Sequence, residues 1–251
     1  NTAEGYNFDY SVELTKTFNN KNWVKIQPLG RYSFARNEFS GKVTTQYIFG
    51  NVDIKRRTTI TASGGKYISQ LNKANKMARA SQFEPSNGMM PILNTFYSLM
   101  LESNYMKVYE MDFAKISLRK NLTDKIRLNA SINWEDRIPL ANTTTHTWVN
   151  WKTRSYTSND PIHFSNFDTS FDRHRATTFE ANFRMQPWLK YRIRNGNKRQ
   201  IDGSSPVIIA NIVSAFKALE SELTYSRIDL GIKHDLEIRS RGRLYYNVTA
   251  G

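Results

Sequence analysis

Histidines are the first residues to consider, because they could bind a metal ion or act as a general base. The chain has four of them, at positions His146, His163, His174 and His234. No two have the spacing of a helical metal site, and the absence of cysteine rules out a cysteine-containing zinc site. The acidic residues between His163 and His174 lack the alternation and turn glycine of a calcium loop. We therefore expect neither a metal nor a cofactor.

Motifs for nucleophilic catalysis and for phosphate loops are also missing. The sequence contains no Gly-x-Ser-x-Gly, no Walker-type loop and no Gly-x-Gly-x-x-Gly. The stretch Ser63-Gly64-Gly65-Lys66 is rich in glycine, but a strand pattern precedes it and no helical pattern follows it. We expect no enzymatic activity.

The charged residues could act through electrostatics alone. Lys and Arg number 36 and Asp and Glu number 22, which gives a net charge of +14. Nucleic-acid binders concentrate basic residues on one face, whereas these are spread over most segments. Asp235 and Glu237 share their alternation phase with Lys233 and Arg239, which indicates ion pairs. We expect no nucleic-acid partner, and a lumen with such a surplus of cations would concentrate anions.

Apolar residues alternate with polar ones along most of the chain, which predicts β-strands. The alternating segments cover residues 6–14, 39–49, 52–62, 126–134, 178–185, 227–239 and 244–248. Most of these segments are about 8 to 13 residues long, whereas strands of globular proteins average about five or six and a tilted membrane-spanning strand needs roughly 9 to 11. Strand length therefore favours an antiparallel transmembrane β-barrel over a soluble β-sandwich, although both show this alternation.

In a barrel, the two phases of each strand face the lipid and the lumen. The lipid-facing candidates are Ile126, Leu128, Ile132, Phe179, Phe183, Ile228, Leu230 and Ile232. The lumen-facing candidates are Lys125, Arg127, Glu180, Arg184, Arg227, Asp229, Lys233, Asp235, Glu237 and Arg239. Aromatic residues gather near expected strand ends, for example Phe18 with Trp23 and Trp148 with Trp151, as in the girdles of outer-membrane barrels. The alternative is that they are core or edge aromatics of a sandwich.

The alternation fades in two places. From Gln70 to Glu110 it is interrupted by two prolines and an Asn-Gly turn signal, and apolar residues at helical spacing predict a short helix near 92–106. Residues 156–172 have the composition of a long loop, whereas 121–124 and 240–242 are short turns. No stretch has the roughly 20 apolar residues of a transmembrane helix. We expect a single domain over 1–251, with about 10 to 12 strands and an irregular or helical insertion at 70–110.

Four motifs stand in the same order as in a known family. They are FARNEFSG at 34–41, SGGKY at 63–67 with QLN at 70–72, NYMKVYE at 104–110, and EDRIPL at 135–140 with NTT at 142–144. Through them the chain resembles a Bacteroidota outer-membrane family of unknown function, whose members carry a carboxypeptidase-regulatory-like domain ahead of a β-barrel.

The resemblance implies a bacterial outer-membrane barrel with membrane lipid and lipopolysaccharide as partners. It implies no peptidase activity, because the N-terminal domain of such proteins is an accessory β-sandwich. Family members are longer and this chain stops within an alternating segment, so we expect it to be part of a larger barrel.

The expected function is a structural or accessory role in an envelope complex, with the long loops contacting other outer-membrane subunits. One alternative is an outer-membrane channel or transporter with a basic lumen. A second alternative is a soluble basic β-sandwich that binds polysaccharide or nucleic acid.

Overall fold

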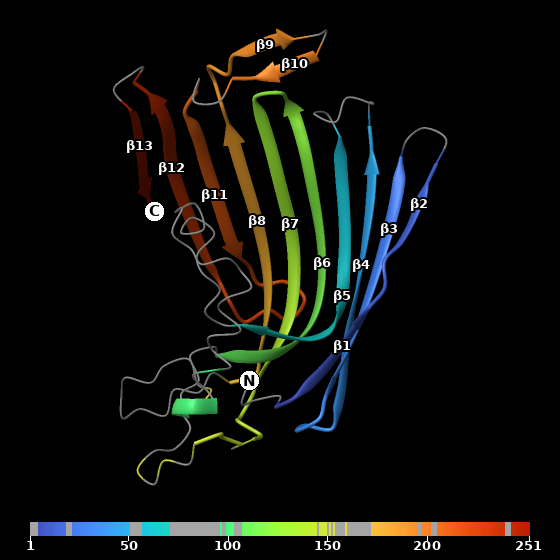
Figure 1. Cartoon of the computed structure of the whole chain (residues 1–251). Helices are drawn as coiled ribbons and strands as arrows, with labels where there is room; N and C mark the ends of the chain where they lie inside the picture. The colour runs from blue at the N-terminus through green and yellow to red at the C-terminus, as the bar shows by residue number, and fades with distance from the viewer. Residues whose placement is uncertain are drawn as a thin grey trace.

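The computed structural model describes residues 5–18, 22–50, 57–70, 96, 99–102, 107–144, 146–149, 151, 153, 159, 172–194, 197–201, 205–238 and 242–251. These residues form an antiparallel all-β structure with almost no helix (Figure 1). The strands are β1 (Asn7–Ser11), β2 (Leu14–Thr17), β3 (Trp23–Ser33), β4 (Glu38–Phe49), β5 (Thr58–Gln70), β6 (Val108–Thr123), β7 (Ile126–Pro139), β8 (His174–Met185), β9 (Tyr191–Arg194), β10 (Asn197–Gln200), β11 (Val207–Ala215), β12 (Tyr225–Glu237) and β13 (Arg243–Ala250).

One sheet contains 11 of the strands in the order β1-β3-β4-β5-β6-β7-β8-β11-β12-β13, with β2 also paired to β3. Strands that follow each other in the chain are mostly neighbours in the sheet, and β9 and β10 form a separate hairpin between β8 and β11. The sheet is open: β1 and β2 lie along one edge and β13 along the other (Figure 1). The predicted all-β antiparallel class is confirmed, but the described strands do not close into a barrel.

Most central strands present one apolar and one polar face. The register aligns five successive, mostly apolar rows, which we call the apolar band. The rows contain, from the β6–β7 turn downwards, Ile126–Met185–Ile208–Ile232; Leu128–Phe183–Ala210–Leu230; Ala130–Ala181–Ile212–Ile228; Ile116–Ile132–Phe179–Ser214; and Val43–Gly64–Ala114–Trp134–Thr177. All eight predicted lipid-facing residues belong to this band. The next row carries charges instead: Lys66, Asp112, Asp136 and Arg175.

The two ends of the sheet differ in their connections. The upper end in Figure 1 holds the tight β6–β7 turn and the β9–β10 hairpin. The lower end holds the longest connections, between β5 and β6 and between β7 and β8, together with the short β3–β4 turn. Short and long connections are therefore only partly separated between the two ends.

The buried core lies at the lower end, where β5 to β8 end or begin. Its largest apolar members are Ile68, Val108, Tyr109 and Met111, whereas Leu189 and Val207 are buried separately at the upper end. Buried carboxylates and hydroxyls lie in the same region: Glu110, Glu135, Asp136, Thr177 and Thr178. Higher up the sheet, the apolar band is covered by no other described segment, so its side chains are half or more exposed at several positions.

Part of the predicted helix lies within the described residues. Phe96 and Leu99–Leu101 are helical, and Glu102 then has a φ of 53°. A positive φ ends a helix, so the helix stops earlier than the predicted residue 106. Most of the remainder of 70–106, and most of the predicted loop at 156–172, lies outside the described residues. No described helix is long and apolar enough to cross a membrane.

Candidate functional site

The polar face of the sheet carries a row of hydrogen-bonded side chains across four adjacent strands. Arg119 on β6 donates from Nε to Asn129 Oδ1 on β7 at 3.2 Å, and Asn129 Nδ2 donates to Asn182 Oδ1 on β8 at 3.2 Å. Asn182 in turn donates to Asn211 on β11. The four residues are register partners. We call this row the asparagine ladder; it ties β6 to β11 through side chains as well as backbone.

Three arginines on the polar face are neutralised by a nearby carboxylate. Arg31 pairs with Asp9 at 2.6 Å, Arg137 with Glu135 at 2.7 Å and Arg227 with Asp229 at 2.8 Å. Arg227 and Asp229, both lumen-facing candidates, thus form an ion pair with each other. In each of these ion pairs the two charges neutralise each other, so these side chains offer little charge for binding a ligand or for catalysis.

The upper end of the polar face differs, because cations gather there. Arg127 on β7 and Arg184 on β8 are register partners, and Lys233 stands nearby on β12. Arg127 donates from Nε to the neutral Asn121 Oδ1 at 3.0 Å, and Lys125 Nζ donates to the Pro187 carbonyl at 3.0 Å. Among the described residues, neither arginine forms an ion pair with a carboxylate.

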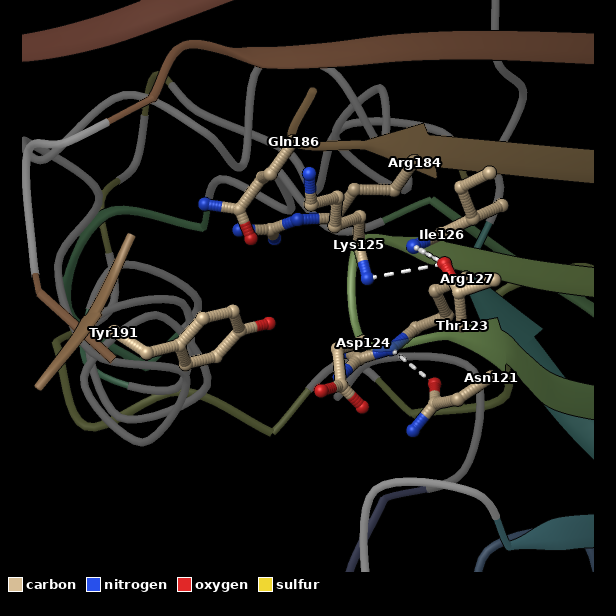
Figure 2. Close-up of a pocket in the computed structure, with 9 residues that line it drawn as sticks. All are labelled: Asn121, Thr123, Asp124, Lys125, Ile126, Arg127, Arg184, Gln186 and Tyr191. Atoms are coloured by element: carbon tan, nitrogen blue, oxygen red, sulfur yellow. Dashed lines mark hydrogen bonds between the residues drawn. The ribbon is translucent and has the colours of Figure 1, made fainter. Parts of the chain in front are cut away.

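A pocket of about 230 Å³ opens between these cations and the β6–β7 turn (Figure 2). Its lining residues are Asn121, Thr123, Asp124, Lys125, Ile126, Arg127, Arg184, Gln186 and Tyr191. Thr123 Oγ1 accepts from the amides of Lys125 and Ile126, at 3.2 and 3.1 Å, and this fixes the turn that forms one wall. Figure 2 shows Tyr191 on the opposite side, with its hydroxyl pointing toward the turn. We call this site the cationic pocket.

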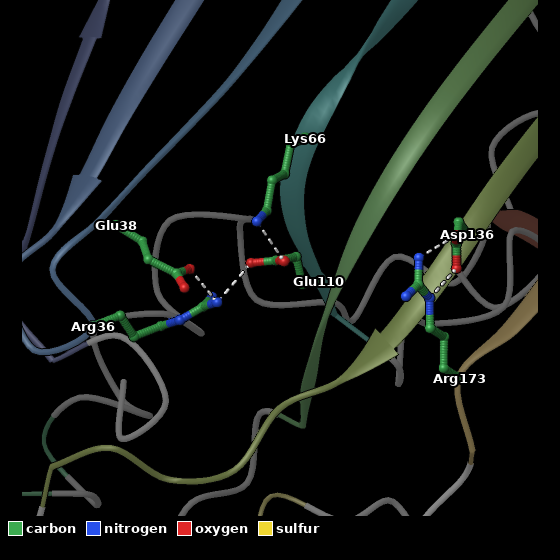
Figure 3. Close-up of polar contacts among 6 residues, drawn as sticks. All are labelled: Arg36, Glu38, Lys66, Glu110, Asp136 and Arg173. Carbon is green, nitrogen blue, oxygen red and sulfur yellow. Dashed lines mark hydrogen bonds and ion pairs between the residues drawn. The ribbon is translucent and has the colours of Figure 1, made fainter.

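A second charged cluster joins elements at the lower end (Figure 3). Glu110 is buried and pairs with Arg36 at 2.7 Å and with Lys66 at 2.9 Å, and Arg36 also pairs with Glu38. Because Arg36 lies in the β3–β4 turn, the cluster ties that turn to β5 and β6.

Asp136 forms a separate pair with Arg173. Arg173 donates from two nitrogens, at 3.1 and 2.8 Å, in a fork that matches the carboxylate. The hydrogen bond to Asp136 raises the pKa of Arg173, which lies outside the strands. In the Glu110 cluster and in the Asp136 pair the charges are paired with each other, so we assign both a structural role.

Asn159 is a buried side chain that sequence reasoning does not identify. Its Oδ1 accepts from the Val108 amide at 2.9 Å, while its Nδ2 donates to the Val108 and Leu140 carbonyls at 2.6 and 2.7 Å. Val108 begins β6 and Leu140 follows β7, so one amide group joins two strand ends. Its surroundings carry no periodic pattern that would reveal this contact.

The structure places the predicted lumen-facing residues on one face, opposite the predicted lipid-facing ones. Lys125 lies in the turn before β7, while Arg127, Glu180, Arg184, Arg227, Asp229, Lys233 and Asp235 lie on the polar face. Glu237 is described through its backbone only, and Arg239 lies outside the described residues. The described part of the chain contains no group of three His, Cys, Asp or Glu residues that could hold a metal ion.

Comparison with known proteins identifies a family. The model of the C-terminal domain of DUF5686, a family of unknown function, matches residues 1–251. The chain therefore belongs to that family. No curated protein and no solved structure matches the chain.

Proposed function

We propose that this family member forms part of the wall of a transmembrane β-barrel in the bacterial outer membrane, with a structural role in an envelope complex and no catalysis. The exposed apolar band carries the proposal. Ile116, Ile132 and Ile228 are 64%, 54% and 58% exposed although they lie in the middle of strands. Apolar patches of this extent on a protein surface mark a binding or membrane interface, and in a bilayer the band would face hydrocarbon.

The dimensions of the band support a membrane location. On β7 and β8, five rows at every second residue span about nine residues, close to the roughly 9 to 11 of a tilted membrane strand. Aromatic residues flank the band: Phe18 and Trp188 are exposed near the upper end, and Phe34 and Phe39 near the lower end. Such girdles lie at the two membrane–water interfaces of outer-membrane barrels.

The polar face would line the interior. Side chains such as Lys115, Ser117 and Ser131 are only half-exposed, whereas the adjacent Ile116 and Ile132 are exposed. A curved sheet shields its concave side, so this difference supports a polar lumen. Hydrocarbon does not tolerate an open sheet edge, so further strands beside β13 and β1 would complete the barrel.

Heat-modifiable gel mobility of the full-length protein, extracted from its native membrane, tests this proposal. A closed barrel runs faster before boiling than after it. We expect that shift, together with resistance to extraction by carbonate. Release by carbonate with no mobility shift would contradict the proposal and favour a soluble basic β-sheet protein that binds polysaccharide or nucleic acid.

The cationic pocket favours a second candidate function, an outer-membrane channel or transporter with a basic lumen. Cations without acidic partners at one end of a lumen would attract anions. Planar-bilayer recordings distinguish the two candidates. Anion-selective conductance would favour the channel, whereas a lumen filled by the asparagine ladder and the ion pairs would conduct no ions.

A further inference from the structure

We propose that the cationic pocket binds a phosphate group, held between Arg127 and Arg184. The inference does not depend on the membrane location, because it concerns a local site at the upper end of β7 and β8. It also goes beyond a conducting lumen, since it assigns a discrete site with named ligands.

The first argument is the position of the two arginines. Arg127 and Arg184 lie directly opposite each other on neighbouring antiparallel strands. Like charges at such a position repel and destabilise the pair of strands. Lys233 on β12 adds a third positive charge close to Arg184. An anion between these groups would remove the repulsion.

The second argument is the contrast with three other arginines of the polar face. Arg31, Arg137 and Arg227 each have a carboxylate within 2.8 Å. Among the described residues, Arg184 forms no side-chain hydrogen bond or ion pair, and Arg127 forms one hydrogen bond, to the Asn121 amide oxygen. Arg127 and Arg184 are therefore register partners that have no carboxylate partner among the described residues, and both line the cationic pocket.

The third argument is chemical fit. A guanidinium group presents planar pairs of N–H donors that match the oxygens of a phosphate. Two such groups that line one pocket could each donate hydrogen bonds to two phosphate oxygens, and Lys125 would add positive charge at the rim. A chloride ion offers no such geometry. The single carboxylate among the lining residues, Asp124, leaves a positive balance of three cations to one anion.

Thermal unfolding of the full-length protein in detergent tests the proposal, with inorganic phosphate as the probe and chloride at matched ionic strength as the reference. A ligand that binds the folded state raises the unfolding temperature with its concentration. We expect phosphate to raise it and chloride not to. In Arg184→Gln, the phosphate concentration needed for the same rise should increase at least about tenfold.

The matched control is Lys115→Gln. It removes one positive charge from the same face of the sheet, but Lys115 does not line the pocket. Phosphate stabilisation should be unchanged in this variant. Arg184→Lys keeps the charge and loses the planar fork, so its response should be intermediate.

Stability without phosphate gives a second, independent result. Because Arg184→Gln removes repulsion from Arg127, the variant should unfold at a higher temperature than the wild type in phosphate-free buffer. A variant that simply misfolded would unfold at a lower one. Equal rises in unfolding temperature with phosphate and with chloride would overturn the proposal. An equal loss of phosphate stabilisation in Arg184→Gln and Lys115→Gln would also overturn it.

The phosphate could come from a solute or from a phosphorylated glycolipid headgroup. Titration of lipid A into the same micelles separates these sources. Stabilisation by free phosphate alone identifies a solute site, and stabilisation by lipid A at concentrations where free phosphate has no effect identifies a headgroup site. Absence of both effects contradicts phosphate binding.

Discussion

At the scale of single residues, Asn159 is the clearest case of one side chain that holds two strand ends. Replacement by alanine would leave the Val108 amide and the Val108 and Leu140 carbonyls without this partner in a site where Asn159 is only 4% exposed. Buried polar groups without partners cost about 1–3 kcal/mol each. We expect Asn159→Ala to lower the free energy of unfolding by roughly 2–4 kcal/mol, measured by urea titration.

The aspartate variant tests the direction of the hydrogen bonds at the same position. Asn159→Asp retains an acceptor for the Val108 amide but places a carboxylate oxygen against two carbonyls. It should therefore be less stable than Asn159→Ala. Equal stability of Asn159→Asp and the wild type would show that the amide nitrogen contributes nothing.

The cationic pocket illustrates which part of a site can be inferred from sequence. Alternation assigns each of Arg127 and Arg184 to the polar phase of its own strand. It does not show that they are register partners, since that depends on the pairing of β7 with β8 across a connection of more than 30 residues. The absence of nearby carboxylates likewise becomes visible only in three dimensions.

At the scale of elements, the asparagine ladder should couple β7, β8 and β11. Removal of Asn182 breaks contacts to both Asn129 and Asn211. A double-mutant cycle with Asn129→Ala and Asn182→Ala should give a coupling energy of about 0.5–1.5 kcal/mol in unfolding experiments. Additive effects of the two substitutions would show that the ladder does not act as a unit.

The apolar band predicts a dependence on depth. Ile228 lies in the middle row and Ile232 in the uppermost row of the same strand. In a membrane, Ile228→Arg should reduce the stability of the inserted protein by about 2–4 kcal/mol and Ile232→Arg by about 0–1 kcal/mol. Ser131→Arg on the polar face is the control. Equal effects of the first two substitutions on insertion into vesicles would argue against a bilayer around this face.

Alternation identifies many of the strands that have one apolar face. It predicts most of β4, β7, β8, β12 and β13, whereas the segment expected over 52–62 covers only the first residues of β5, and β6 lies outside the expected segments. It misses β11, because Val207, Ile209 and Val213 make the polar side of that strand apolar as well. It also misses β3, where Pro28 and Gly30 interrupt the pattern. The segment expected to be a single strand over 6–14 is divided in the structure into β1 and β2 along β3.

At the scale of the whole molecule, the open sheet and its two faces form one argument. The apolar band is exposed, the polar face is bound together by the asparagine ladder and ion pairs, and the two edges are unpaired among the described strands. A soluble two-layer sandwich would bury the apolar band under a second sheet, and the described residues contain only the separate β9–β10 hairpin besides the main sheet. A membrane-embedded wall accounts for these features together.

The most direct test is cysteine accessibility along β12, which is practical because the 251 residues contain no cysteine. Single cysteines are placed at consecutive positions from Ile228 to Lys233 in the full-length protein in native membranes, and each is treated with a water-soluble, membrane-impermeant thiol reagent or a lipid-soluble one. We predict an alternating result: cysteines at 228, 230 and 232 react with the lipid-soluble reagent, and those at 229, 231 and 233 with the water-soluble one. Reaction of all six positions with the water-soluble reagent would contradict the membrane-wall account.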